Sequence, residues 1–153
     1  GYTFLMRLLV LWLENGAEIL NSYRAIGRFV TIVAIGLVWL RMSKNEKNPI
    51  RLYMITLLSF LAFTHAFSIQ YLVWVLPFSL LNIHTQYLWV KRYLIASFAY
   101  CFLVYNTLIL QPAITNLLPW PLADIAIIIP ASLPVWLVVV FWLFGLMKRV
   151  SSL

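Results

Sequence analysis

Five apolar runs occupy most of this chain, and each approaches the length that a helix needs to cross a lipid bilayer. They lie at residues 26–42, 52–67, 69–83, 93–110 and 125–147. A helix crosses the hydrocarbon core in roughly 20 residues. Of the 153 residues, 64% are hydrophobic and only 10% are charged, whereas about a quarter of a soluble domain is charged. The sequence therefore predicts an all-α polytopic transmembrane bundle, with about five spanning helices in a single membrane domain over residues 1–153.

Residues 1–23 do not fit this series of spans. On a helix, Arg7, Glu14 and Glu18 would share one face and leucines would gather on the others, which is typical of a helix lying in the membrane interface. The end of a membrane helix whose beginning is missing fits these residues equally well. Because the chain starts at Gly1 without a signal-peptide pattern, we expect it to be the C-terminal part of a longer multi-pass protein.

Basic residues are distributed unevenly among the connecting segments. Lys and Arg occur at 43–51, 84–92 and 148–153, whereas 68–70 and 111–124 contain none. The positive-inside rule places the first group in the cytoplasm and the turn after residue 64 on the outer side. We expect the membrane to be the plasma membrane of a prokaryote.

The formal charge of +7 follows from these helix-end cations and not from a continuous basic patch. We therefore expect the lipid bilayer, and no nucleic acid, as a partner. Arg24 and Arg28 lie on the outer side against the rule, so they need an explanation of their own.

Groups for acid–base or metal chemistry are scarce. The carboxylates are Glu14, Glu18, Glu46 and Asp124, and no pair of His, Cys or acidic residues has the spacing of a metal centre. Asp124 stands at a helix start, where a carboxylate interacts favourably with the positive end of the helix dipole. We expect no metal ligand and no catalytic residue within this chain, and its dependence on a divalent metal stays open.

One compact polar cluster separates the second and third apolar runs. Its hydroxyl, imidazole and amide groups can form hydrogen bonds, and an aromatic ring one helical turn later can pack against a sugar or an isoprenoid. The alternative is that these groups cap helix ends and belong to the interfacial aromatic belt. Pro77 should kink the third helix in its second half. The cluster consists of Thr64, His65, Ser68, Gln70, Tyr71 and Trp74.

Residues 68–77 read Ser-Ile-Gln-Tyr-Leu-Val-Trp-Val-Leu-Pro. This run resembles the Ser-Pro-Gln-Tyr-x-x-Trp-x-x-Pro element of polyprenol-phosphate-sugar-dependent glycosyltransferases of the GT-C superfamily, including its mannosyltransferase-like branches. Ile69 stands where that element has proline, which alters the turn. The resemblance covers about ten residues of the chain.

The resemblance implies a membrane glycosyltransferase that moves a hexose such as mannose from a polyprenyl phosphate to an acceptor on the outer face. Gln70 and Tyr71 would shape the donor or acceptor pocket, with Ser68, His65 and Trp74 as further contacts. Arg24 and Arg28 would pair with the donor phosphate, although they also fit as snorkelling anchors. The acceptor is not specified by the sequence.

The catalytic Asp or Glu of that superfamily lies in an early outward loop and has no counterpart here, so we expect this chain alone to be inactive. A second class of function is a non-catalytic integral membrane subunit or a small transporter. A transporter should have polar or broken helices near the membrane midplane. The mid-span residues here are mostly Leu, Ile, Val and Phe, and Pro130 and Pro134 give the nearest approach to a broken helix.

Overall fold

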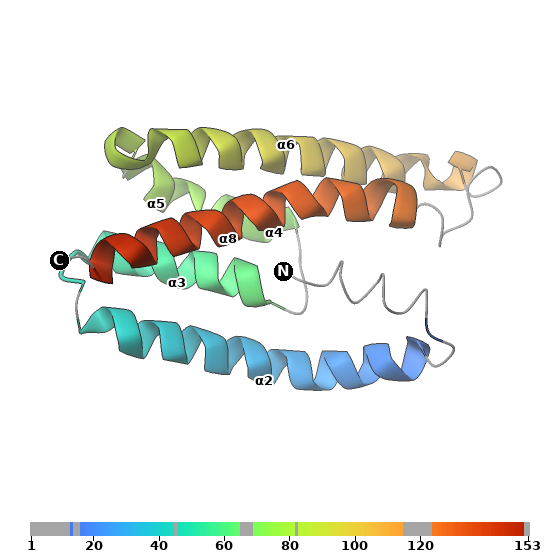
Figure 1. Ribbon diagram of the computed structural model, residues 1–153. Coiled ribbons are helices and arrows are strands. Elements are labelled where there is room, and N and C mark those ends of the chain that lie inside the picture. The colour runs from blue at the N-terminus through green and yellow to red at the C-terminus, as the bar shows by residue number, and fades with distance from the viewer. Residues whose placement is uncertain are drawn as a thin grey trace.

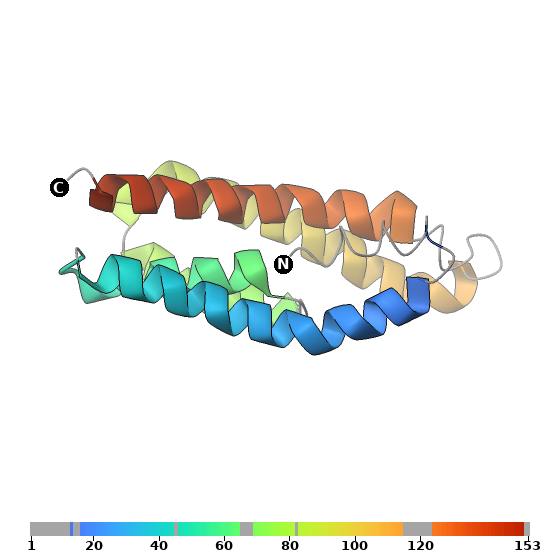
Figure 2. The same ribbon diagram turned by 60° about the horizontal axis from the view of Figure 1, so that its bottom comes forward.

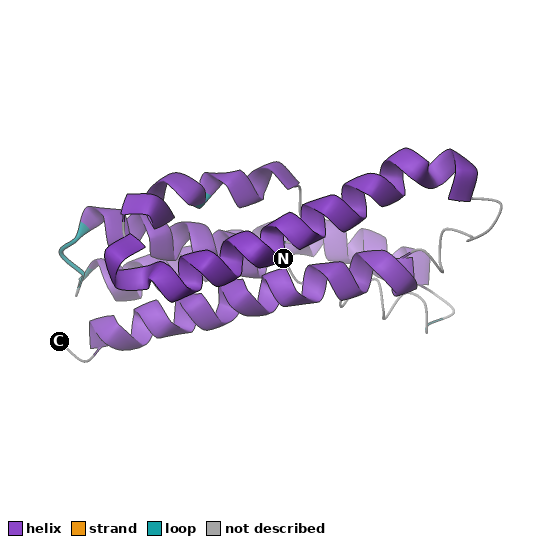
Figure 3. Ribbon diagram, turned by 90° about the horizontal axis from the view of Figure 1, so that it is seen from above, coloured by secondary structure: helices purple, strands orange, loops and turns teal. Residues whose placement is uncertain are grey.

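The computed structural model describes residues 13, 16–44, 46–64, 69–81, 83–114 and 124–151. Within these residues every regular element is a helix, which confirms the predicted all-α bundle (Figure 3). The elements are α2 (Gly16–Ser43), α3 (Pro49–Phe63), α4 (Ile69–Trp74), α5 (Leu76–Leu81), α6 (Ile83–Ile114), the π-helix η1 (Asp124–Ile128) and α8 (Ile129–Ser151).

Three helical segments are long and apolar enough to cross a membrane, namely Ala25–Ser43, Ile83–Asn106 and Ala126–Lys148. The other two expected spans correspond to α3 and to α4 with α5, which are shorter. The 15 residues of α3 give a length of about 22 Å, below the ~30 Å of a bilayer core. These short helices run antiparallel to each other beside one half of the long helices, as a half-length hairpin (Figures 1 and 2).

The first helix begins earlier than expected. Residues 16–23, which we assigned to an interfacial or truncated helix, form the first turns of α2 and continue into the span. Residues 1–12 lie outside the described part of the chain. The expected start of the last span is confirmed, because η1 begins at Asp124 and leads directly into α8.

Local sequence chemistry sets the start of the hairpin. The side chain of Asn48 accepts hydrogen bonds from the backbone nitrogens of Ile50 (3.0 Å) and Arg51 (3.4 Å). Pro49 follows at the first helical position, where its missing N–H costs nothing. This N-cap explains why α3 begins directly after Asn48.

The far end of the hairpin lies inside the bundle. The last carbonyls of a helix have no partner within it, and here the neighbouring helices supply the donors. The Thr31 hydroxyl on α2 shares its single proton between the carbonyl of Phe63 at 2.9 Å and the carbonyl of Gly27 on its own helix at 2.7 Å. The Trp136 indole on α8 donates to the carbonyl of Ala62 at 3.0 Å. Non-helical backbone at membrane depth requires such protein partners.

The outward position of the turn after residue 64 stays a prediction, but the end of α3 lies short of one end of the long helices (Figure 1). Thr31, which is level with the end of α3, lies about 9 Å inside the apolar segment that starts at Ala25, at 1.5 Å per residue. The long helices continue past the hairpin toward the end that carries Gly16, Ile114 and Asp124 (Figure 1). Because α3 is much shorter than the long helices, it does not extend to that end of the bundle. Hydrophobic periodicity alone does not reveal this difference in length.

The second arm of the hairpin is broken as Pro77 predicts. Helix α4 ends at Trp74, Val75 is a turn, and α5 starts at Leu76. Proline cannot donate a backbone hydrogen bond, so one hydrogen bond of the helix is missing here. The hydroxyl of the buried Tyr93 on α6 donates to the carbonyl of Leu72 at 2.7 Å, which satisfies an acceptor next to the break.

Helix α6 begins at Ile83, so the connecting segment expected at 84–92 is helical apart from a kink. The segment does contain an interruption, because Gln86 has a non-helical backbone (φ −129°, ψ 16°) and two helical pieces meet at a kink there. Its buried side chain accepts a hydrogen bond from the Trp142 indole at 3.3 Å. Lys91 and Arg92 are exposed on the helix that follows this kink, where long basic side chains can reach the interface from within a span.

The ends at Ser43, Pro49, Ile83 and Ser151 lie together, and we call this the basic end of the bundle (Figure 1). The expected grouping of the segments at 43–51, 84–92 and the C-terminus on one side agrees with this arrangement. Arg51 connects two of these segments, because its side chain lies 3.2 Å from the Glu46 carboxylate and donates to the carbonyl of Leu146 at 3.2 Å.

Replacing Trp136 by phenylalanine should destabilise the bundle by about 1–2 kcal/mol, because the buried carbonyl of Ala62 loses its donor. Equilibrium unfolding in mixed micelles with increasing SDS measures this change. The control is Trp39→Phe, since Trp39 is exposed on α2 and should tolerate the same substitution. Equal stabilities for the two variants would contradict the role assigned to the indole N–H.

Candidate functional site

Three aromatic side chains gather where α3 meets α4. The rings of Tyr71 and Trp74 have centroids 4.9 Å apart, and Phe60 on α3 meets Tyr71 edge-on at 5.2 Å. Phe60 also stacks with Trp74 at 6.1 Å. The turn of α4 brings the two predicted residues together, because positions three apart share a helix face. We call Phe60, Tyr71 and Trp74 the aromatic cluster.

The cluster is accessible and carries polar groups. Trp74 is 50% exposed, Tyr71 is half-buried, and Gln70 beside them is exposed. Within the described residues, no hydrogen bond engages the Tyr71 hydroxyl or the Gln70 amide. An aromatic face flanked by an amide and a phenol suits a ligand with both hydroxyl groups and apolar C–H edges, such as a sugar.

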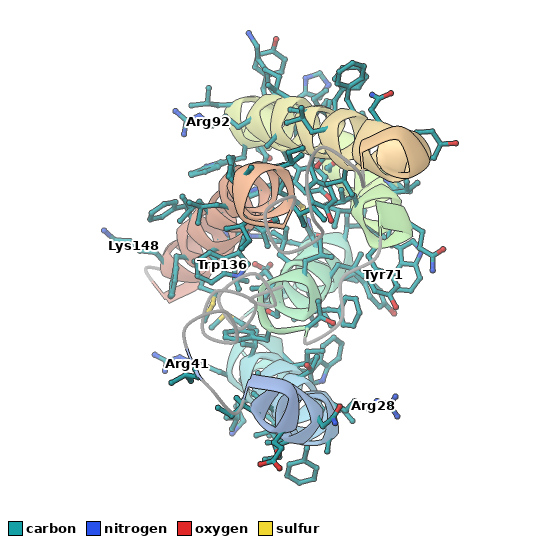
Figure 4. The ribbon with its side chains drawn as sticks, turned by 90° about the vertical axis from the view of Figure 1, so that its right-hand side faces the viewer. Arg28, Arg41, Tyr71, Arg92, Trp136 and Lys148 are labelled. Carbon is teal, nitrogen blue, oxygen red and sulfur yellow. The ribbon has the colours of Figure 1, made fainter. Side chains whose placement is uncertain are left out.

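Arg28 lies on the same side of the bundle as Tyr71, whereas Arg41, Arg92 and Lys148 project on the opposite side (Figure 4). Arg28 is one helical turn from Thr31, on the side away from the basic end, so it flanks the end of α3. Tyr71 is level with Phe60, one turn on the other side of that end. The backbone positions of Arg28 and Phe60 are thus about 10 Å apart along the bundle axis, at 1.5 Å per residue.

The Arg28 side chain is exposed, and no ion pair or hydrogen bond joins it to another described residue. A charged group within an apolar span is costly unless it meets a partner or reaches the interface. Arg28 is therefore suited to receive an anionic group of a ligand. Arg24, the other predicted cation, belongs to α2. The structure describes its backbone but not its side chain.

Two further predicted residues, His65 and Ser68, lie outside the described residues, so their positions relative to the cluster stay predictions. The structure therefore brings together Gln70, Tyr71 and Trp74 on one helix, and adds Arg28 on the same side of the bundle.

An apolar crevice lies between α6 and α8 on the side of the hairpin end that faces away from the basic end. Its volume is about 250 Å³. Small side chains open it, because alanine and proline leave space between neighbouring helices. Its lining consists of Ala96, Ala99, Leu103, Ala126, Ile127, Pro130, Ala131 and Pro134.

Sequence reasoning missed Phe60, Thr31 and Trp136, which build and hold this region. Phe60 is one apolar residue among many in its run, so nothing marks it. Thr31 and Trp136 each place a hydrogen-bond donor deep in an apolar span. A donor in that environment must find an acceptor, and this requirement was the available signal for an interrupted helix nearby.

Among the described residues, no three His, Cys, Asp or Glu side chains lie close enough to share a metal ion. Comparison of the chain with models of protein families, with curated proteins and with solved structures finds no match. The resemblance at residues 68–77 therefore stands on those residues, and the function must be argued from the site. Chemically, the site offers a cation, an exposed aromatic surface and hydrogen-bond groups beside lipid.

Proposed function

We propose that this chain forms the donor-side wall of a membrane glycosyltransferase that uses a polyprenyl-phosphate-linked hexose, with mannose as the first candidate. The single observation that carries the proposal is that Arg28 and the aromatic cluster lie on the same side of the bundle and flank the end of α3 (Figure 4). The cation suits a phosphate, the aromatic face suits a sugar, and both are accessible from the bilayer that holds the polyprenyl chain.

The transfer itself needs few groups from this chain. The acceptor hydroxyl attacks the anomeric carbon, the bond from that carbon to the phosphate oxygen breaks, and polyprenyl phosphate leaves with the electron pair. The acceptor proton passes to a carboxylate base, which the superfamily pattern assigns to a segment preceding this chain. Arg28 would stabilise the charge that develops on the departing phosphate. Trp74 and Gln70 would orient the sugar ring.

Replacing Trp74 by leucine should weaken binding of a diazirine-bearing polyprenyl-phosphate-mannose analogue about 3- to 10-fold, because the aromatic contact is lost while an apolar side chain remains. Photo-crosslinking in membranes, followed by peptide mapping, measures this binding without requiring turnover. The analogue should label α4 and the neighbouring part of α2 in the wild-type protein.

The matched control is Trp39→Leu, an equal loss at an exposed tryptophan on α2 near the basic end. Labelling should persist in this variant. Labelling distributed evenly over the lipid-facing helices, with no difference between the two variants, would refute the proposal.

The broken hairpin favours a second candidate, a subunit of a small transporter. Discontinuous helices that end within the membrane often surround substrate sites in transporters. Here α3 ends level with Thr31, inside the apolar segment of α2, and Val75 separates α4 from α5. Reconstitution into liposomes distinguishes the candidates. Flux of a small solute that Trp74→Leu abolishes, without labelling by the lipid analogue, would favour the transporter.

A further inference from the structure

The hydroxyl of Tyr93 connects α6 with α4, the short helix that carries the proposed sugar contacts. It donates a hydrogen bond of 2.7 Å to the carbonyl of Leu72. Leu72 directly follows Tyr71 and stands two residues before Trp74, so its carbonyl belongs to the helical turn that carries two rings of the aromatic cluster. The hydrogen bond therefore holds the backbone to which these two rings are attached.

Tyr93 itself occupies a fixed position in the core. Its side chain is fully buried, and its ring centroid lies 5.8 Å from that of Trp142 on α8. Trp142 is equally buried, and its indole donates to the side chain of Gln86. Large side chains in a close-packed core do not change rotamer without opening a cavity. The packed pair of helices α6 and α8 therefore presents the Tyr93 hydroxyl to α4 from a rigid base.

The carbonyl that Tyr93 engages lies beside a break in the backbone. Helix α4 has 6 residues and ends at Trp74, before the turn at Val75. The last four carbonyls of a helix have no partner within it, and Pro77 has no backbone N–H to offer to the preceding turn. Continuity with α5 therefore does not fix the position of α4, and contacts with other helices must do so.

Contacts with two other helices hold α4 in place. On α3, the ring of Phe60 meets those of Tyr71 and Trp74. Aromatic rings attract one another over a broad range of arrangements, so this contact permits small shifts. A hydrogen bond to a carbonyl is restricted to a narrow range of distance and angle. The bond from Tyr93 to Leu72 is thus the contact that defines where α4 lies relative to α6.

We propose that Tyr93 is a positioning residue, whose hydroxyl holds α4 so that Tyr71 and Trp74 present their rings to a ligand in one geometry. Tyr93 does not touch that ligand, because its side chain is buried. Rings that are already in place bind a sugar more tightly, since less conformational freedom is lost on binding. The effect on sugar binding rests on the proposed function, whereas the position of α4 can be measured on the protein alone.

Amide hydrogen exchange of the intact protein in detergent micelles tests the hold on α4. Tyr93→Phe removes the hydroxyl and keeps a ring against Trp142. Exchange in peptides that cover α4 should become about 3- to 10-fold faster, the factor expected for one lost hydrogen bond. Exchange in α8 should stay within about 2-fold of wild type, because the opening is local. Unchanged exchange in α4 would overturn the proposal.

Two control variants separate this role from a general loss of stability. Tyr105→Phe removes the same group from an exposed position of α6 and should leave exchange in α4 unchanged. Trp142→Phe removes another buried hydrogen bond, the one to Gln86, and should keep exchange in α4 within about 2-fold of wild type although the bundle is less stable. Equal acceleration of α4 by Trp142→Phe and Tyr93→Phe would overturn the proposal, because Tyr93 would then contribute only to overall stability.

Fluorine NMR reports on the rings themselves. In protein labelled with 5-fluorotryptophan, the signal of Trp74 is assigned by its loss in Trp74→Leu. Tyr93→Phe should shift or broaden this signal, because the Tyr71 ring has its centroid 4.9 Å away and alters the local field. The signal of the exposed Trp39 on α2 should stay in place. A Trp74 signal that keeps its wild-type position and width in Tyr93→Phe would overturn the positioning role.

The labelling experiment connects this role to the proposed function. Tyr93→Phe should reduce labelling of α4 by the polyprenyl-phosphate-mannose analogue about 3-fold, although every residue proposed to contact the sugar is retained. Wild-type labelling without preference for α4 would refute the proposed function, and the exchange and NMR results would still decide whether Tyr93 positions α4. Specific labelling that Tyr93→Phe leaves undiminished would overturn the contribution of Tyr93 to ligand binding.

Discussion

Replacing Trp142 by alanine is expected to destabilise the bundle by about 2–4 kcal/mol, the largest effect of a single substitution on this fold. Trp142 is fully buried, its ring centroid lies 5.8 Å from that of Tyr93, and its indole donates to Gln86. In a bilayer, transfer of the side chain out of water contributes little to the stability of the bundle. The loss of stability therefore comes from the cavity that alanine leaves and from the lost packing contacts. The SDS unfolding midpoint should fall accordingly.

A second variant separates packing from hydrogen bonding at this position. Trp142→Phe keeps most of the ring but removes the indole N–H, so the buried Gln86 loses its donor and the expected cost is about 1–2 kcal/mol. The alanine variant should therefore be clearly less stable than the phenylalanine variant. An alanine variant as stable as the wild type would mean that α6 and α8 do not pack as described.

Under the proposed function, replacing Arg28 by glutamine in the whole enzyme is expected to raise the KM for a polyprenyl-phosphate-linked hexose about 10- to 100-fold, because a charged hydrogen bond to phosphate contributes this much to binding. The same substitution should leave the stability of the bundle unchanged or slightly higher, because a charge exposed within an apolar span is costly. Donor titrations in membranes of the intact protein, together with SDS unfolding, provide both readouts.

The control for this substitution is Lys44→Gln, which removes a positive charge from the far end of α2. Its KM should stay within 2-fold of wild type, and Arg28→Lys should fall between the wild type and Arg28→Gln. If Arg28→Gln lowers stability and leaves the KM unchanged, Arg28 is an anchor that snorkels to the headgroups, as the alternative interpretation holds.

Local chemistry made several elements of the fold predictable. Pro49 after Asn48 marks a helix start, and Pro77 removes a backbone donor wherever its helix lies, so the start of α3 and the break before α5 follow from the residues themselves. The segment at 84–92 was predicted to be a loop because of its cations, whereas it is helical apart from the kink at Gln86. Exposed Lys and Arg are compatible with a continuous helix when their long side chains reach the interface.

The candidate site was predictable only in part. Tyr71 and Trp74 are three residues apart, so a helix brings them together without any long-range contact. The addition of Phe60 depends on how the hairpin closes, and the placement of Arg28 on the same side depends on how α2 packs against α3. No local pattern encodes either relation.

The sequence by itself determined that this protein is an all-helical membrane bundle, because apolar runs of this length can satisfy their backbone groups in lipid only as helices. Only the tertiary structure decided that two of those runs stop short and pair as a hairpin. An apolar run shows that a segment can be buried but not how far it extends across the bilayer. That depth depends on donors from other helices, here Thr31 and Trp136, which satisfy the carbonyls at the end of α3.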